Sequence, residues 1–262
     1  MIIVKTPEQI KLMRIAGRIT GEALLLGGEM VKPGVSTKQI DDKIRHYIEK
    51  CGAKPSFLGY GGFPGSACIS INQEIIHGIP SSHRIIEEGD IVKIDVGAYI
   101  HGFHGDSANT FPCGNVSEEA KKLIAVTKRS WELGAEAAGK EGARIGDIGA
   151  AVDGYVVANG FSTVKKYVGH GVGEDLHEDP NVPNWGRKHT GLKLEAGMVL
   201  AIEPMINMGS RNIIIDRDGW TCRTRDHKPS AHYEHTLAIV DDKVEILTTF
   251  DYVEEVLQDR FI

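Results

Sequence analysis

The sequence predicts an α/β protein built from two similar halves. Three observations support this: helix-capping residues followed by apolar residues at helical spacing, short runs that alternate like strands, and residues that recur at one constant offset. The chain has 262 residues, of which 41% are hydrophobic and 25% are charged. This composition is ordinary for a globular protein with a core. It excludes a disordered chain, a collagen or a coiled coil as a description of the whole.

Two helices are predicted near the N-terminus from their capping residues. Thr6 is followed by a proline and, three residues later, by Gln9, which is the pattern of a capping box with proline at the first helical position. Apolar residues at helical spacing then predict a helix that runs to about Met30. A second helix is predicted to begin after Ser36 and to end near Gly52, because glycine favours the residue after a helix end.

Strands are predicted at 68–72 and 90–96. Residues 68–72 alternate between apolar and polar side chains, and 90–96 hold an apolar run with acidic residues inside it. A turn near Gly102 is predicted to return the chain through His104 to Phe111. The second strand and this returning segment should therefore form a hairpin.

The second half of the chain repeats the first at an offset of 108 residues. The repeated pairs include Gly34 and Gly142, Tyr47 and Tyr155, Gly52 and Gly160, and Asp95 and Glu203. One spacing held over such a span predicts a duplicated αβ unit, with halves at roughly 6–112 and 117–248 related by a pseudo-twofold axis. The period is too long for a solenoid, so we expect a single domain over 1–262.

Charge and cysteine content exclude several classes of protein. Lys plus Arg number 30 and Asp plus Glu number 36, giving a net charge of −6, whereas a nucleic-acid partner needs a basic face. Four cysteines without a C-x-x-C pair exclude a disulfide scaffold and a ribbon-type zinc site. No stretch approaches the roughly 18 to 20 apolar residues of a membrane span, and no signal-like apolar region follows Met1. We therefore expect a cytoplasmic protein with no membrane partner.

Four carboxylates interrupt apolar strands at matching places in the two halves. Asp95 and Asp106 are predicted to lie side by side on one face of the hairpin, and Glu203 and Glu234 to face them across the pseudo-axis. Unpaired buried acids cost several kcal/mol each and repel one another. Two divalent cations would neutralise them, and Mn, Fe, Co or Zn suits oxygen-rich sites with some nitrogen. Such a pair is a hydrolytic site, although any one acid alone could be an N-cap, a salt-bridge partner or a solvated strand end.

Spacing alone does not choose among the histidines near these acids. His104 shares strand parity with Asp106, and His232 shares it with Glu234, so either could reach a metal. A buried or surface hydrogen-bonding role is the alternative for each.

Three other histidines lie in special local sequences. His170 has glycines on both sides, which let the backbone approach closely and leave the ring accessible. His77 and His177 occupy matching His-x-x-Pro turns, one in each half, and could flank a shared site. No dinucleotide loop, phosphate loop, H-E-x-x-H helix or G-x-S-x-G elbow occurs. For Cys68 we expect a structural or pocket-lining role.

Five sequence strings resemble the type I methionine aminopeptidases. They are Gly-Asp-Ile-Val-Lys-Ile-Asp95-Val, Gly-Phe-His-Gly-Asp106-Ser, Gly-His170-Gly-Val-Gly, Ile-Glu203-Pro-Met and Tyr-Glu234-His-Thr. The resemblance runs from the first helix to about Thr248. It implies the pita-bread fold, in which helices back a curved antiparallel sheet. It also implies two divalent metal ions (cobalt, iron, manganese or zinc) held by Asp95, Asp106, His170, Glu203 and Glu234.

The same resemblance implies a reaction and the residues that perform it. N-terminal methionine would be removed from nascent proteins and peptides, with a small second residue preferred, by attack of a metal-bridging hydroxide on the scissile carbonyl. Glu203 would carry the proton, His177 would bond the oxyanion and His77 would orient the scissile amide. The methionine pocket would be lined by Tyr60, Phe63, Cys68 and Trp220. A monovalent cation is implied near Asn72 and Ser230.

Two alternatives stay open at the level of the sequence. One is a relative with another specificity, such as an Xaa-Pro dipeptidase or aminopeptidase P, although those enzymes usually carry an extra N-terminal domain. The other is a non-catalytic binding module, although such a protein should have lost some of the five ligand positions. We expect a monomer whose partner is the N-terminus of a peptide or nascent protein. The sequence does not decide whether it contacts the ribosome.

Overall fold

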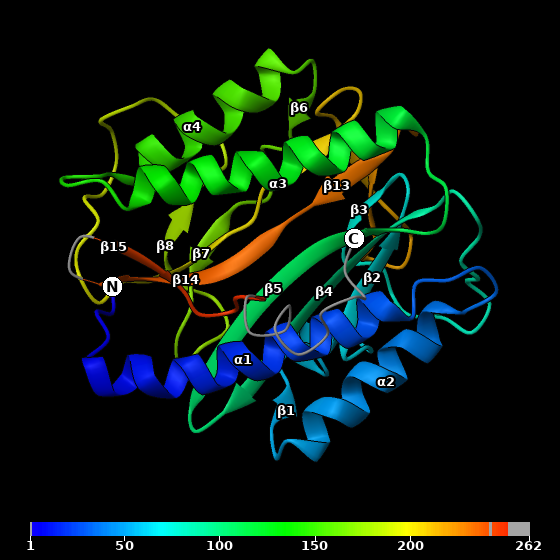
Figure 1. Cartoon of the computed structure of the whole chain (residues 1–262), viewed down its shortest axis with the longest axis horizontal. Coiled ribbons are helices and arrows are strands. Elements are labelled where there is room, and N and C mark those ends of the chain that lie inside the picture. The colour runs from blue at the N-terminus through cyan, green and yellow to red at the C-terminus, as the bar shows by residue number, and fades with distance from the viewer. Residues whose placement is uncertain (1, 241–242, 251–262) are drawn as a thin grey trace.

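Four long helices lie against one face of a curved antiparallel sheet in the computed structural model (Figure 1). The helices are α1 Pro7–Glu29, α2 Thr37–Lys50, α3 Glu118–Ala138 and α4 Ile145–Ala158. The structure describes residues 2–240 and 243–250. Met1 and 251–262, which belong to the predicted domain, thus lie outside the described residues. The predicted fold class, mixed α/β with a curved antiparallel sheet, is confirmed.

The large sheet has nine strands, all paired antiparallel. Its main path runs β1 Lys54–Pro55, β4 Ile91–Ile100, β5 Phe103–Pro112, β14 Glu234–Val240, β9 Val199–Ile202, β7 Gly169–Gly171 and β8 Glu178–Val182. Off this path, β2 Ala67–Ile71 pairs with β4, and β15 Lys243–Ile246 pairs with β14.

Two three-stranded sheets and one short 3-10 helix flank the large sheet. The first small sheet holds β13 Ser230–His232, β10 Met205–Asn207 and β6 Ser162–Thr163. The second holds β11 Ile213–Ile215, β12 Cys222–Thr224 and β3 Glu74–Ile76, and the 3-10 helix η1 spans Tyr60–Gly62. These short elements surround the end of the large sheet at which the polar side chains gather.

The predicted helix boundaries are confirmed to within a residue or two. Thr6 and Ser36 both form capping boxes, each accepting a hydrogen bond from the backbone N–H of the glutamine three residues later. The first helix ends at Glu29, with Met30 as its C-cap. Gly52 follows the second helix with a φ of 73°, the left-handed conformation that favours glycine at this place.

The strands around the predicted hairpin are confirmed, but the hairpin is longer than expected. Strand β2 covers most of the predicted 68–72, and β4 and β5 pair in register from Ile91 opposite Pro112 to Ile100 opposite Phe103. The turn between β4 and β5 holds His101 and Gly102 at φ values of 54° and 87°. Ten pairs in unbroken register give this hairpin a well-defined direction for every side chain.

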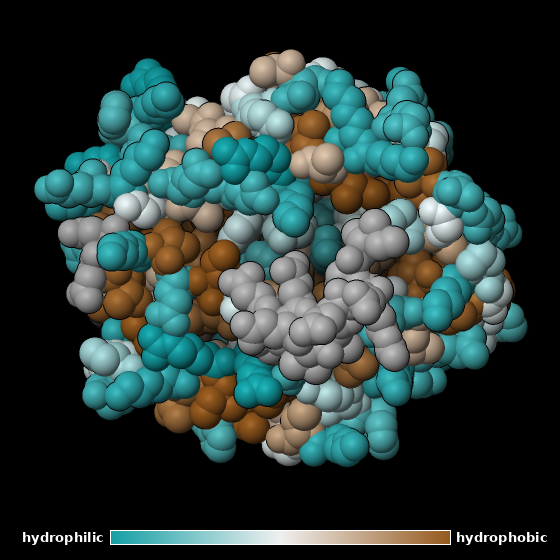
Figure 2. All heavy atoms as spheres, viewed as in Figure 1, coloured by the Kyte–Doolittle hydropathy of each residue, from teal (hydrophilic) through white to brown (hydrophobic). Residues whose placement is uncertain are grey.

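Each pair of helices packs on its own part of the sheet. Ile44 of α2 lies in one buried cluster with Ile94 of β4, and Trp131 of α3 lies in another with Leu200 of β9. The helical face is mostly covered by hydrophilic side chains, with smaller hydrophobic patches between them (Figure 2). Within the described ranges, none of the helices has the length and apolar character that crossing a membrane requires. The duplication into halves at 6–112 and 117–248 stays a prediction.

Candidate metal centre and active site

Five polar side chains come from five strands that are neighbours in the large sheet. In the order β4, β5, β14, β9 and β7 they are Asp95, Asp106, Glu234, Glu203 and His170, with Glu203 directly after the end of β9. Ala108 of β5 lies opposite both Asp95 and Glu234, and Ala201 of β9 lies opposite His170. Side chains two residues apart along a strand share a face. All five therefore project from one face, and the two alanines leave room between them.

Three of the four acids are buried, and the fourth, Asp95, is half-buried. Asp106, Glu234 and Glu203 are 3%, 2% and 9% exposed. Burial raises the pKa of all four carboxyls, and it raises that of Asp106 to about 7. Asp106 in addition raises the pKa of the other three by charge repulsion. Among residues 2–240 and 243–250, no lysine or arginine forms an ion pair with any of them.

His170 presents one ring nitrogen to the acids. Its Nδ1 lies 2.8 Å from the carbonyl oxygen of Gly171. Because a carbonyl can only accept, Nδ1 donates, and Nε2 is left with its lone pair. Nε2 lies 3.8 Å from Asp106 Oδ2 and 3.6 Å from Glu203 Oε1. Burial also lowers the pKa of His170 to about 3, so the ring is neutral and able to bind a metal.

Polar side chains of the second half hold the backbone of two of these acids. Thr236 Oγ1 accepts from the N–H of Asp106 at 3.0 Å and donates to its carbonyl at 2.8 Å. Asn184 Nδ2 donates to the carbonyl of Glu203 at 2.9 Å. These contacts fix the backbone from which each of the two carboxylate side chains extends.

The donor atoms fit divalent cations. Oδ1 of Asp95, Oδ1 of Asp106 and Oε1 of Glu234 are buried without a hydrogen-bond partner among the described residues. Buried polar atoms are rarely left unpaired, because each one costs free energy. Ligand atoms of Asp106, His170 and Glu234 lie within 4.8 Å of one another. Carboxylate oxygens with an imidazole nitrogen suit first-row transition metals.

A cavity of about 150 Å³ is lined by the four acids and His170 together with apolar and aromatic side chains. The predicted pocket residues Tyr60, Phe63, Cys68 and Trp220 all line it. Phe57 and Leu176 also line it. Both lie in loop segments without a periodic pattern, so only the comparison with the family, and not the strand or helix pattern, points to their position.

His77 and His177 both line this cavity. The ring of His177 lies 4.1 Å from that of His170, and its Nδ1 is 2.9 Å from the hydroxyl of Tyr60. The ring of His77 packs edge-on against Trp220 at 6.3 Å. Burial and the neighbouring His177 lower the pKa of His77 to about 4, and partial burial lowers that of His177.

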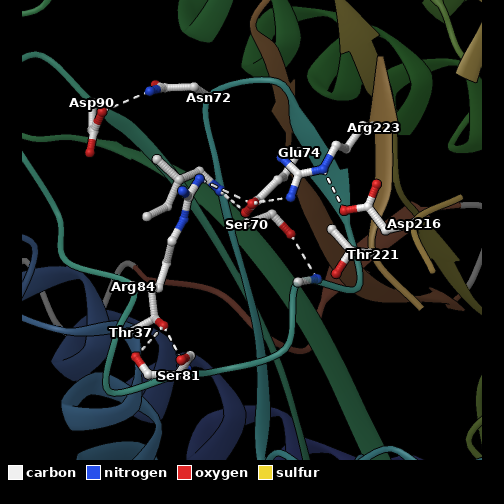
Figure 3. Close-up of polar contacts among 12 residues, drawn as sticks. Thr37, Ser70, Asn72, Glu74, Ser81, Arg84, Asp90, Asp216, Thr221 and Arg223 are labelled. Carbon is white, nitrogen blue, oxygen red and sulfur yellow. Dashed lines mark hydrogen bonds and ion pairs between the residues drawn. The ribbon is translucent and has the colours of Figure 1, made fainter. Parts of the chain in front are cut away.

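A polar network around Glu74 holds strand β3, which ends directly before His77 (Figure 3). Glu74 Oε1 pairs with Arg84 and Arg223 at 3.0 Å each, and its Oε2 accepts from the N–H of Ile71 at 2.7 Å. Past His77, the next N–H, that of Gly78, donates to a serine hydroxyl at 3.0 Å. His77 itself has a φ of 59°, an uncommon conformation that these contacts support.

The structure separates the two histidines that share strand parity with the acids. His104 Nδ1 lies 2.8 Å from the hydroxyl of Ser56, and its ring stacks 4.6 Å from that of Tyr99. His232 instead approaches the acids, with Nε2 3.6 Å from Glu234 Oε2. Strand parity predicted that either ring could reach a metal, and only the surroundings of each ring in the structure distinguish the two.

The carbonyl of Asn72, where a monovalent cation is predicted, already has two donors. The N–H of Ser230 donates to it at 3.0 Å, and the ammonium of Lys93 donates at 2.7 Å. Lys93 is 1% exposed, and burial lowers its pKa to about 7. Two donors thus already satisfy this carbonyl, and the monovalent cation stays a prediction.

Known proteins share both the sequence and the fold. A model of metallopeptidase family M24 matches residues 11–241. A methionine aminopeptidase of Clostridium perfringens is 53% identical over 248 residues, covering 95% of this chain and 99% of that protein. Methionine aminopeptidase 1 of Bacillus subtilis is 50% identical over 248 residues, with coverage of 95% and 99%. The crystal structure of methionine aminopeptidase from Rickettsia prowazekii has a TM-score of 0.93 at 40% identity, covering 95% of this chain and 100% of that one. The resemblance drawn from the motifs is confirmed.

Proposed function

The chain belongs to metallopeptidase family M24, and on this premise we propose that it removes the N-terminal methionine from peptides and nascent proteins. One observation carries the proposal. Three buried acids, the half-buried Asp95 and one neutral imidazole converge in a cavity that apolar side chains also line. No lysine or arginine among the described residues pairs with the acids, which is the arrangement that bound cations would stabilise.

We assign the proposed ligands to two metal positions. Asp106 and Glu234, on neighbouring β5 and β14, would contribute to both positions. His170 and Glu203 would complete one position, and Asp95 the other. Divalent ions, when bound, polarise a carbonyl and lower the pKa of a water molecule.

Glu203 is the acid that we propose carries the proton. It directly follows the last residue of β9 and lines the cavity. A carboxylate at the cavity can accept a proton from the attacking water and deliver it to the leaving amine. Its backbone is held by Asn184, so the carboxylate keeps its place during the transfer.

His177 and His77 would bind the reacting amide from opposite sides. If the hydroxyl of Tyr60 donates to Nδ1 of His177, then Nε2 of His177 carries the hydrogen and can donate to the developing oxyanion. The low pKa of His77 keeps that ring neutral, so it can orient the scissile amide by a hydrogen bond without adding a charge.

The apolar and aromatic side chains of the cavity would contact the methionine side chain. Phe63 and Trp220 meet edge-on at 5.2 Å on the cavity wall, and Cys68, which lies opposite Asp95 in the sheet, lines the cavity as well. A thioether is flexible and makes favourable contacts with aromatic rings, so this lining suits methionine. A small second residue, a cytosolic location, a monomeric state and any contact with the ribosome stay predictions.

The Glu203→Gln variant tests the proton-transfer role. Turnover of the peptide Met-Ala-Ser should fall by about 10²-fold or more, the scale of losing a general acid–base group. Glu195→Gln, which changes an exposed glutamate of the same half, is the matched control and should keep its turnover. Near-normal turnover by Glu203→Gln would refute the role.

Substrate comparison tests the specificity. Met-Ala-Ser should be cleaved faster than Leu-Ala-Ser, because the unbranched thioether adapts to the aromatic wall, and faster than Met-Trp-Ser, because the second residue is crowded. Peptides that begin Ala-Pro should be poor substrates. A preference for the Ala-Pro peptides would instead indicate the Xaa-Pro specificity.

A further inference from the structure

Two triads of possible ligands share Glu234. One is Asp106, His170 and Glu234, and the other is Asp95, His232 and Glu234, and in each the ligand atoms lie within 4.8 Å of one another. The first triad contains the histidine of the proposed centre. The second contains a histidine to which neither the motifs nor the comparisons assign a role. This histidine lies at the proposed metal position that carboxylates alone would otherwise form.

The backbone of His232 is fixed on both sides. It is the last residue of β13, where it pairs with Met205 of β10. Its N–H donates to Thr110 Oγ1 at 2.9 Å, and its carbonyl accepts from the same hydroxyl at 2.8 Å. Thr110 belongs to β5, the strand of Asp106. His232 is therefore tied to the hairpin that carries two of the acids.

The ring of His232 is buried, and Nε2 has no partner. The residue is 2% exposed, and Nε2 forms no hydrogen bond within the described part of the chain. It lies 3.6 Å from Glu234 Oε2, too far for a hydrogen bond but suited to two ligands of one ion. Asp95 Oδ1 and Glu234 Oε1 are likewise without partners. A single cation would satisfy all three orphaned atoms, each of which costs free energy when unpaired.

We propose that His232 Nε2 is a ligand of the divalent ion held by Asp95 and Glu234. This inference rests on the proposed dinuclear centre and adds a sixth ligand to it. Each metal position then has one imidazole nitrogen, His170 at one and His232 at the other. Nitrogen ligation favours Fe, Co, Ni or Zn over Mg or Ca, so the second position should discriminate against Mg²⁺ as the first does.

Cobalt binding to His232→Gln tests the proposal. Calorimetric titration of the metal-free protein with Co²⁺ should show two ions bound in the wild type, and a loss of about 10- to 100-fold in the affinity for one of them in the variant. His104→Gln is the matched control, because that histidine shares the strand parity but bonds Ser56. The control should bind both ions as the wild type does.

Proton NMR of the Co²⁺-loaded protein reports the ligation directly. A ligating imidazole gives a strongly shifted N–H signal that disappears in D₂O. We expect two such signals in the wild type and in His104→Gln, and one in His232→Gln. A single signal in the wild type would overturn the proposal, as would unchanged affinity in His232→Gln.

The proposal and the function on which it rests fail differently. If the wild type binds two ions and cleaves Met-Ala-Ser while His232→Gln behaves identically, only the role of His232 is wrong. If the wild type binds no divalent ion, the dinuclear function is refuted, and His232 as a ligand is refuted with it.

Discussion

The two halves bring their acids to the same face of the sheet by different means. In the first half, Asp95 and Asp106 lie on one hairpin whose ten pairs keep a single register. In the second half, His170, Glu203 and Glu234 come from three separate strands, and the register shifts within Gly169–Gly171. A regular hairpin holds two charges in fixed places. Short strands that break beside the site instead leave a carboxylate and an imidazole open to the cavity.

This difference suggests a division of roles. The hairpin would set where cations bind, and the strand ends of the second half would supply nitrogen ligation and proton transfer. The following substitutions test that division, beginning with the largest expected effect.

The largest effect is expected from Asp106→Asn in the hairpin. Asp106 lies in the same hairpin as Asp95 and 3.8 Å from His170 Nε2, so it would contribute to both proposed metal positions. Its loss should weaken metal binding by about 10²- to 10³-fold, the scale of about 3–5 kcal/mol for removing one partner of a buried charge pair. Calorimetric titration measures this, with Asp153→Asn in helix α4 as the control. Undiminished binding of both ions would show that the hairpin does not set the positions.

His77→Asn tests the histidine that the first half contributes to the cavity. Turnover should fall by about 10²-fold, the scale of losing an oriented hydrogen bond in the transition state. The pKa of His77 is lowered to about 4, so the ring is neutral throughout pH 6 to 8. The ratio of wild-type to variant turnover should therefore stay constant over that range. A ratio that changes tenfold near pH 6.5 would mean that the ring titrates during the reaction.

The same pKa also predicts the sign of a stability effect. In the unfolded chain His77 has the ordinary pKa of about 6.5 and takes up a proton before the folded chain does. The folded state therefore loses stability as the pH falls from 6.5 to 4. His77→Asn should lose less over this interval than the wild type does, as thermal denaturation at several pH values would show.

A smaller effect is expected at Thr236, whose hydroxyl links β14 to β5. Thr236→Val removes the hydroxyl that bonds both the N–H and the carbonyl of Asp106, and should lower the free energy of unfolding by about 1–3 kcal/mol. Thr163→Val is the matched control, because its hydroxyl is buried without a partner among the described residues. That substitution should be neutral or stabilising. Equal losses in both variants would contradict a specific role for Thr236.

The sequence predicted the first half better than the second, for a physical reason. Capping boxes and the Asp95–Asp106 spacing are local signals, and one hairpin converts that spacing into a shared face. The strands at His170 and Glu203 have three and four residues and are broken by glycine or proline, so they carry no alternating pattern. Their place in the sheet was inferred from the repeat, and the choice of His170, His77 and His177 came from the family resemblance.

Parity along a strand did not distinguish His104 from His232. The strand pattern predicts that each histidine shares a strand face with a nearby acid. In the structure, however, Ser56 and Tyr99 contact the ring of His104 away from the proposed metal centre. Which ring reaches the acids depends on neighbours that are distant in the chain, and no local signal records them. The same holds for Phe57 and Leu176, which reach the cavity from loops.

Anomalous diffraction from crystals grown with Mn²⁺ tests the central claim most directly. The claim is that bound cations neutralise the four acids that the two halves bring together. The account predicts two anomalous peaks, both within coordination distance of Asp106 and Glu234. Crystals that diffract well but show no peak there, with the carboxylates paired to lysine or arginine side chains, would contradict it.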